Sequence, residues 1–424
     1  MCMGQAVAII KDGTILMKTI RLVFLSLAGW YCVLITANYF DQRPLWNDER
    51  AVLLSIVHRS PAQLFSAPLL QYQEFPRFYL WCVQQFSRSL HYHLLALRFF
   101  SFLAMLAAFF VWLNVARRQS RDPRALILFT GCWCASIPLV YHAAELKPYS
   151  MDVLVSGLFM LFLCRQPDLQ KKPVLYRSLL FFLPLSGVMS YPVIFLFPFP
   201  LYNLLREDYA RRRLSPEIFF YLGGGILWLL FVYFFDYRVT TTRFLQTCWH
   251  DYFISFNSMG DFLKTLGEQF NNIISRWFAE KPKWIKYAAR FFVGSGFLYM
   301  SVNAGRIFKE EGFKFRSLVP VALGVFLIHL ALGCLHKYPF SIPRLSLFFA
   351  PLLLWMTVLA MQWLREKSKV LGTVVEVVFG LYLVFISAGI AFVIFTGNQS
   401  LPDHGTGLGA QSELWQKGLE GGQF

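Results

Sequence analysis

Three short polar clusters interrupt an otherwise apolar chain of 424 residues. They are residues 46–50 (WNDER), 142–149 (HAAELKPY) and 337–344 (KYPFSIPR). Each cluster contains groups that carry charge, either carboxylates that accept a proton or cations that bind an anion. Together the clusters predict acid–base chemistry on an anionic substrate.

Within these clusters, Asp48 or Glu49 is the expected general base, and Lys147 and Arg344 are the expected anion-binding cations. When a sugar leaves a lipid phosphodiester, the charge of the remaining phosphate grows from one toward two. Cations beside it therefore interact more strongly as the bond breaks. Because a phosphate leaves without needing a proton, one base on the acceptor hydroxyl suffices. The pattern favours sugar transfer from a lipid phosphate.

Each cluster also has a purely structural explanation. Asn47 is expected to cap a helix, with the two carboxylates that follow it in the first turn, near the positive end of the helix dipole. Glu145 and Lys147 are expected to pair at the membrane rim, and Arg344 to anchor a span at the interface. Since neighbouring helix residues point about 100° apart, only one of the two adjacent carboxylates is expected to face a cavity.

The composition is that of a membrane protein. Hydrophobic residues make up 56% and charged residues 15% of the chain, against about 25% charged in soluble domains. Its net charge of +16 comes from basic loops between apolar runs, which positive-inside topology predicts, so we expect membrane lipids and no nucleic acid as partners. Eight scattered cysteines show no metal-binding spacing. No cofactor is required, and a divalent metal stays open.

Long apolar runs predict an all-α polytopic membrane protein with about eleven transmembrane helices. The expected spans are 20–40, 94–116, 124–142, 149–164, two short spans within 178–205, 217–235, 287–305, 317–335, 344–363 and 370–396. The stretch 178–205 is divided near Ser190-Tyr191 because four prolines interrupt it.

We expect one membrane unit at residues 1–396 and a flexible tail at residues 397–424. The membrane unit has two long outer loops, at residues 41–93 and 236–286. With the N-terminus inside, the short basic loops fall on the cytoplasmic side, and the three polar clusters share the opposite face. In the first outer loop, residues 48–59 and 78–86 are amphipathic and are expected to lie in the interface plane as helices.

At the polar clusters the chain resembles the membrane-embedded GT-C glycosyltransferases, in particular the bacterial family 39-like proteins related to protein O-mannosyltransferases and lipid A aminoarabinose transferases. The matching segments cover most of residues 18–365 and are WNDERAVLLSI at 46–56, QYQEFPRFYLWCVQQF at 71–86, LLALRFFSFLAMLAAFF at 94–110, YHAAELKPYSMDVLVS at 141–156, LSGVMSYPVIF at 185–195 and YPFSIPRLSLFFAPLLL at 338–354. Relatives often carry two prolines where this chain has Pro76-Arg77, so the local turn departs from the pattern.

This resemblance implies an acidic catalytic or donor-contacting role for Asp48, with Glu49 beside it. The implied donor phosphate-binding residues are Lys147, Arg344, Arg98 and Tyr149, and further site candidates are Glu145, Gln73 and Tyr338. The implied reaction is an inverting transfer from a polyprenyl-phosphate-linked sugar to a hydroxyl of a glycan, lipid or protein. Its implied location is the non-cytoplasmic face of a bacterial plasma membrane, in cell envelope glycosylation.

A secondary transporter or lipid flippase is the alternative function. Such proteins carry polar sites near mid-membrane on broken helices, often within inverted repeats. The proline-broken stretch 178–205 favours this alternative, whereas the polar clusters lie at span ends and no repeat is evident. A non-catalytic membrane scaffold would require the three clusters to coincide by chance. The aromatic residues of loop 236–286 are interpreted as an interfacial belt, so none is a catalytic candidate.

Overall fold

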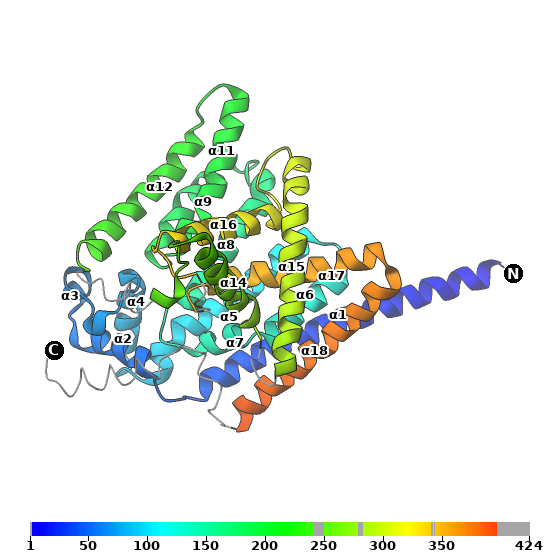
Figure 1. Cartoon of the computed structure of the whole chain (residues 1–424), viewed down its shortest axis with the longest axis horizontal. Coiled ribbons are helices and arrows are strands. Elements are labelled where there is room, and N and C mark those ends of the chain that lie inside the picture. The colour runs from blue at the N-terminus through cyan, green and yellow to red at the C-terminus, as the bar shows by residue number, and fades with distance from the viewer. Residues whose placement is uncertain (1, 241–249, 279–282, 341, 343, 397–424) are drawn as a thin grey trace.

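The computed structural model describes residues 2–240, 250–278, 283–340, 342 and 344–396, and these contain helices and no strand (Figure 1). The helices are α1 (Cys2–Phe40), α2 (Asn47–His58), α3 (Pro61–Ser66), η1 (Leu70–Tyr72), α4 (Arg77–Arg88), α5 (Leu94–Gln119), α6 (Pro123–Ala135), α7 (Ile137–Tyr141), η2 (His142–Ala144), α8 (Tyr149–Leu169), α9 (Pro173–Leu185), η3 (Ser186–Val188), α10 (Val193–Leu196), α11 (Pro198–Arg211), α12 (Pro216–Val232), η4 (Tyr233–Tyr237), η5 (His250–Tyr252), α14 (Met259–Ser275), α15 (Lys283–Glu310), α16 (Leu318–Cys334), η6 (Leu347–Phe349), α17 (Ala350–Lys367) and α18 (Lys369–Thr396). The predicted all-α class is confirmed.

Within the described residues, five helices are long and apolar enough to cross a membrane: Lys18–Phe40, Leu94–Gln119, Pro216–Tyr237, Leu347–Lys367 and Lys369–Thr396. A helix satisfies its backbone polar groups internally, which makes it suitable for a lipid environment. Large apolar side chains on α18, such as Leu381 and Phe392, are exposed on the protein surface, as lipid-facing residues are. The chain is an all-α membrane protein.

The predicted span 124–142 is not one straight helix. α6 ends at Ala135, and the following segment Ile137–Ala144 is bent by 67° from it, so the two count as a sixth span only when taken together. Ser136 is extended between the two helices, and Pro138 lies in the first turn of the second one, where a missing backbone N–H costs nothing. Residues 142–150 after the bend are all buried. The break thus carries the second polar cluster into the protein interior.

Other predicted boundaries are partly confirmed. The break near Ser190-Tyr191 is present, because α9 and η3 end at Val188 and α10 begins at Val193. The span predicted to start at 344 begins instead at Leu347, which leaves Arg344 in the preceding turn. Helix α14 occupies part of the loop 236–286, and the tail 397–424 lies outside the described residues.

The first outer loop forms the expected amphipathic helices α2 and α4. The prediction that Asn47 caps α2 is wrong by one residue, because Asn47 is already helical and Trp46 is the N-cap. The Glu49 carboxylate accepts the Trp46 backbone N–H at 3.4 Å, which satisfies a donor at the helix start. Figure 1 shows α2, α3 and α4 grouped at one end of the molecule, beside the end of α12, and α3 packs on η4 there.

Helices α9 and α12 approach each other closely at Gly224. A Cβ added at Gly224 would lie 2.0 Å from the carbonyl oxygen of Phe181, so only glycine allows this backbone contact. α12 carries Trp228 and leads into Asp236. The contact therefore fixes one wall of the cavity described below.

Gly224→Ala is expected to lower the thermal unfolding midpoint of the detergent-purified protein by several degrees. The new methyl would force α12 away from α9, and overpacking of this kind costs about 1–3 kcal/mol. Gly223→Ala is the matched control, since its Cβ would meet only the Phe181 ring at 3.9 Å. Equal midpoints for the two variants, measured by scanning fluorimetry, would contradict the close contact.

Candidate functional site

Asp48, in the first turn of α2, binds two cations that are distant in sequence. Its Oδ2 accepts hydrogen bonds from Lys147 Nζ at 2.8 Å and from Arg344 Nη1 at 2.6 Å. The side chain of Lys147 is 1% exposed, whereas those of Asp48 and Arg344 are 19% and 16% exposed. The three clusters singled out in the sequence thus meet around one carboxylate, and solvent reaches this site from the side of Asp48 and Arg344.

Aromatic rings surround the Lys147 ammonium. Its Nζ lies 4.6 Å, 5.5 Å and 5.6 Å from the ring centroids of Trp46, Phe75 and Tyr149. The Arg344 guanidinium lies 5.4 Å from the centroid of Trp46. Ring faces stabilise a nearby cation, and by excluding water they strengthen its attraction for an anion. The environment of both cations therefore favours a tightly held anionic partner.

The two cations control the protonation of Asp48. Burial alone raises the pKa of a carboxyl, but the charges of Lys147 and Arg344 outweigh it and hold the pKa of Asp48 below its ordinary value. Burial lowers the pKa of Lys147, and the Asp48 carboxylate counteracts that effect. In this arrangement Asp48 is an ionised ion-pair partner and a weak base.

Glu49, the neighbour of Asp48, points into the interior and pairs with Arg98. The guanidinium donates to both carboxylate oxygens, from Nε at 3.1 Å and from Nη2 at 2.8 Å, and both side chains are fully buried. The Leu146 backbone N–H donates to Glu49 at 2.7 Å. As expected, only one of the two carboxylates faces the site. Arg98 is fully buried and donates to Glu49 and to the Arg43 carbonyl, so its contacts indicate a supporting role in place of the implied phosphate contact.

Glu145 pairs with His142, and the predicted pairing with Lys147 is wrong. Its Oε2 contacts His142 Nδ1, and its Oε1 accepts the Trp46 indole N–H at 2.9 Å. Although burial opposes ionisation, the charge of His142 outweighs it and holds the pKa of Glu145 well below its ordinary value. Lys147 instead forms an ion pair with Asp48, because α2 places the Asp48 carboxylate next to the Lys147 ammonium. Glu145 instead fixes the Trp46 ring beside the two cations.

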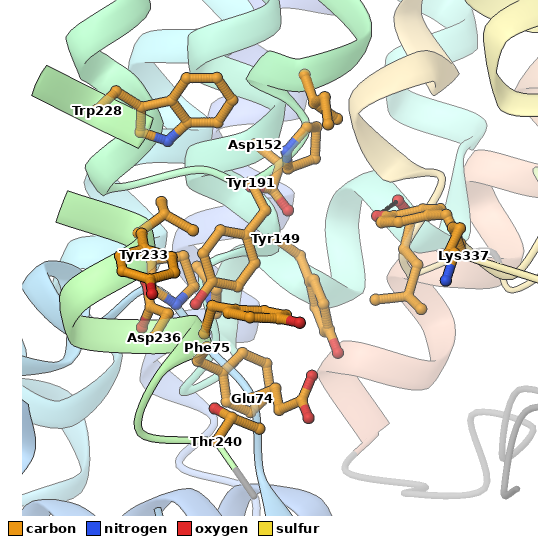
Figure 2. A pocket seen from close by; sticks show the side chains of 18 of the residues that line it. Glu74, Phe75, Tyr149, Asp152, Tyr191, Trp228, Tyr233, Asp236, Thr240 and Lys337 are labelled. Atoms are coloured by element: carbon orange, nitrogen blue, oxygen red, sulfur yellow. Dashed lines mark hydrogen bonds between the residues drawn. The ribbon is translucent and has the colours of Figure 1, made fainter. Parts of the chain in front are cut away.

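A cavity of about 1020 Å³ lies next to this site. Its lining includes Phe75 and Tyr149, the rings that contact Lys147, together with Leu345, which follows Arg344 in the chain. Figure 2 shows Phe75 and Tyr149 between Asp236 on one side of the cavity and Lys337 on the other. Its walls come from α8, from α12 and η4, from the break after η3 and from the turn that precedes η6. The cation pair is thus at the edge of a large aromatic cavity.

The remaining candidate residues divide into two groups. Tyr149 and Tyr338 line the cavity, and the Tyr338 hydroxyl donates to the carbonyl of Leu345 at 2.8 Å. Gln73 donates to the carbonyl of Gln71 at 3.2 Å, within its own loop. The two tyrosines therefore adjoin the site, whereas the Gln73 amide makes a local loop contact.

The ion pair between Arg77 and Asp236 was not predicted. Arg77 Nε lies 3.2 Å from Asp236 Oδ1, and Arg77 Nη1 donates to the carbonyls of Leu64 and Ala67, each at 2.8 Å. Two features of the sequence could have indicated this ion pair. A carboxylate at the end of an apolar run is costly without a partner, and Arg77 stands where the chain departs from the proteins it resembles.

No protein-family model, curated protein or solved structure matches the chain. Among the described residues, no group of three or more His, Cys, Asp and Glu side chains is placed to hold a metal ion. What the site binds is therefore inferred from its own groups: one carboxylate shared by two cations at the edge of an aromatic cavity.

Arg98→Met is expected to lower the free energy of unfolding by about 3–5 kcal/mol, because the Glu49 carboxylate would stay buried without its cation. The yield of monodisperse protein and the thermal unfolding midpoint measure this loss. Arg118→Met is the control, since Arg118 is partly exposed, 3.5 Å from Asp168, and such pairs contribute about 0–1 kcal/mol. Equal losses in both variants would argue against a structural role for the Glu49–Arg98 pair.

Proposed function

We propose that the chain is a GT-C-type glycosyltransferase that moves a sugar from a polyprenyl-phosphate donor to an acceptor hydroxyl. The observation that supports this most directly is the Asp48 carboxylate shared by Lys147 and Arg344. Two cations converging on one anionic group, at a partly exposed position beside an aromatic cavity, fit a lipid-borne phosphate. Tyr149 lies at the junction of the cation pair and the cavity.

In this proposal the donor phosphate replaces Asp48 between Lys147 and Arg344. A sugar phosphodiester carries one negative charge, and its phosphate approaches two charges as the bond to the anomeric carbon breaks. The two cations therefore bind the transition state more strongly than the bound donor, which lowers the barrier. The aromatic rings around Lys147 keep this interaction in a poorly hydrated environment.

Donor binding also activates the base. Once the phosphate neutralises Lys147 and Arg344, the pKa of Asp48 rises, because burial and the nearby phosphate charge both oppose ionisation. Asp48 then takes the proton of the acceptor hydroxyl, the hydroxyl oxygen bonds to the anomeric carbon, and polyprenyl phosphate leaves with the electron pair of the broken bond. This single displacement inverts the anomeric carbon. Glu49 is not the base, since both its oxygens accept hydrogen bonds from Arg98.

We further propose about eleven spans, with the N-terminus in the cytoplasm and the site on the opposite face of a bacterial plasma membrane. Helices occur at every expected span, although five pass the length and hydropathy criteria as single helices in the described part of the chain. The basic loops 117–124, 165–177 and 306–316 supply the positive-inside signal. The acceptor class stays open among glycans, lipids and proteins of the cell envelope.

A secondary transporter or lipid flippase is the second candidate. The 67° bend at Ser136 and the break between Val188 and Val193 favour it, because transporters use broken helices to line binding sites. The two functions differ in their products. A transporter or flippase moves its substrate unchanged, whereas the transferase releases free polyprenyl phosphate.

Asp48→Asn is expected to abolish sugar transfer and to bind polyprenyl phosphate more tightly than the wild type. The asparagine cannot act as a base, and without its negative charge it competes less with phosphate for Lys147 and Arg344. Release of polyprenyl phosphate from polyprenyl-phosphate sugars measures turnover, and native mass spectrometry in detergent measures binding.

Lys147→Ala is the partner variant and is expected to weaken polyprenyl-phosphate binding by about tenfold or more, since it removes a charge-assisted contact. Asp168→Asn, on a solvent-exposed side chain, serves as the control and should keep wild-type turnover and binding. Turnover by Asp48→Asn at the wild-type rate would refute the assignment of the base.

The pH dependence of kcat is expected to differ from that of kcat/KM. Transfer needs the ionised form of Asp48. In the free enzyme its pKa is lowered, so kcat/KM should hold as the pH falls from 8 to about 5, still above the ordinary carboxyl value. In the donor complex the pKa of Asp48 is higher, so kcat should fall at a higher pH than kcat/KM does. Initial rates across this range, fitted at each pH, measure both. A coincident decline of the two parameters would contradict base activation by the donor.

A further inference from the structure

Three buried side chains on the cavity wall have a polar atom without a hydrogen-bond partner in the described part of the chain. These atoms are Oδ1 of Asp152, Oδ2 of Asp236 and Nε1 of Trp228. The three residues are only 7%, 7% and 5% exposed. Buried polar atoms are costly when unsatisfied, so a site that retains several of them beside one cavity indicates a ligand that completes their hydrogen bonds.

Two of the side chains that carry these atoms, those of Asp236 and Trp228, have other contacts that position them. Asp236 is fixed through its other oxygen by Arg77 at 3.2 Å, and the Trp228 ring packs near Phe197, with centroids 6.5 Å apart. The Tyr191 hydroxyl interacts with Asp236 and the Ser190 hydroxyl with Asp152, but Asp236 Oδ2 and Asp152 Oδ1 have no partner at full hydrogen-bond geometry. Figure 2 shows Trp228, Asp152 and Asp236 around the same cavity as Tyr191. The cavity thus offers two carboxyl groups, one of which is fixed by Arg77, and one indole N–H donor.

The chemistry of these atoms narrows the ligand class. Carboxylate oxygens accept and the indole N–H donates, so the ligand must do both. An ammonium group only donates, and an ionised phosphodiester only accepts, so neither supplies both kinds of partner. Hydroxyl groups do both, and several of them on one ring can reach several partners. The rings of Phe75 and Tyr149 supply flat apolar surfaces for the C–H face of such a ring.

We propose that the cavity is a saccharide-binding site in which Asp152 and Asp236 accept hydrogen bonds from sugar hydroxyls and Trp228 donates one. This inference rests on the proposed function, because it places a sugar of that reaction next to Lys147 and Arg344. The volume of about 1020 Å³ is at the upper end for ligand pockets. It is larger than one monosaccharide requires, so the bound sugar belongs either to the donor or to a saccharide acceptor.

The test compares the binding of three kinds of probe to the detergent-purified full chain by native mass spectrometry. The probes are polyprenyl phosphate, a panel of polyprenyl-phosphate hexoses and pentoses, and phosphate-free oligosaccharides. The variants are Asp152→Asn and Trp228→Phe, which keep the size or shape of the side chain. Asp236→Asn is avoided, because it would leave Arg77 buried without its counter-ion. Trp284→Phe is the control, since Trp284 is 53% exposed on α15.

If the cavity holds the donor sugar, Asp152→Asn and Trp228→Phe weaken binding of a polyprenyl-phosphate sugar by about tenfold or more and leave polyprenyl phosphate unaffected. If the cavity holds the acceptor sugar, the two variants bind the phosphate-free oligosaccharides more weakly instead. Unchanged affinity for every sugar-bearing probe overturns the inference. Failure of the proposed function is a separate result, namely that the wild type does not bind polyprenyl phosphate. In that case the oligosaccharide measurements alone test the saccharide site. The inference is overturned if the wild type does not bind the oligosaccharides, or if the two variants bind them as the wild type does.

Discussion

The site depends on one electrostatic constraint: a buried lysine and a partly buried arginine lie side by side and require an anion between them. Lys147 and Arg344 meet this requirement through a single oxygen of Asp48. A receptor for phosphate has to carry such a charge pair even when it is empty, and unpaired charges in a poorly hydrated site are unstable. In the proposed function, the aspartate occupies the position that the donor phosphate takes later. In the proposed reaction its displacement links donor binding to the appearance of a base, so the base is weak until the donor is present.

The two adjacent carboxylates of α2 bind different cations, because neighbouring helix residues point in different directions. Asp48 faces the cation pair, and Glu49 faces Arg98 in the interior, where it also receives the Leu146 backbone N–H. That second set of bonds fixes the position of the loop that presents Lys147. The bend at Ser136 turns the same loop inward. A buried ion pair and a broken helix therefore both contribute to the position of Lys147.

Much of this arrangement follows from the sequence. The apolar runs predicted the helical membrane class, the prolines predicted the break at Ser190-Tyr191, and topology placed the three polar clusters on one face. Pairing between distant residues was harder to predict. Asp48 and Arg344 are 296 residues apart, and spacing alone cannot choose between partners that packing brings together. Glu145 was for this reason assigned to its near neighbour Lys147. The unsatisfied atoms of Asp152, Asp236 and Trp228 depend on the cavity itself, so no sequence pattern reports them.

The most direct test of the central claim is a cryo-electron-microscopy structure of the chain with polyprenyl phosphate bound. The account predicts phosphate density between Lys147 Nζ and Arg344 Nη1, with the Asp48 carboxylate moved away from both and the Glu49–Arg98 pair unchanged. A phosphate bound elsewhere would contradict the account. So would a bound phosphate that leaves the Asp48–Lys147 contact at its present 2.8 Å.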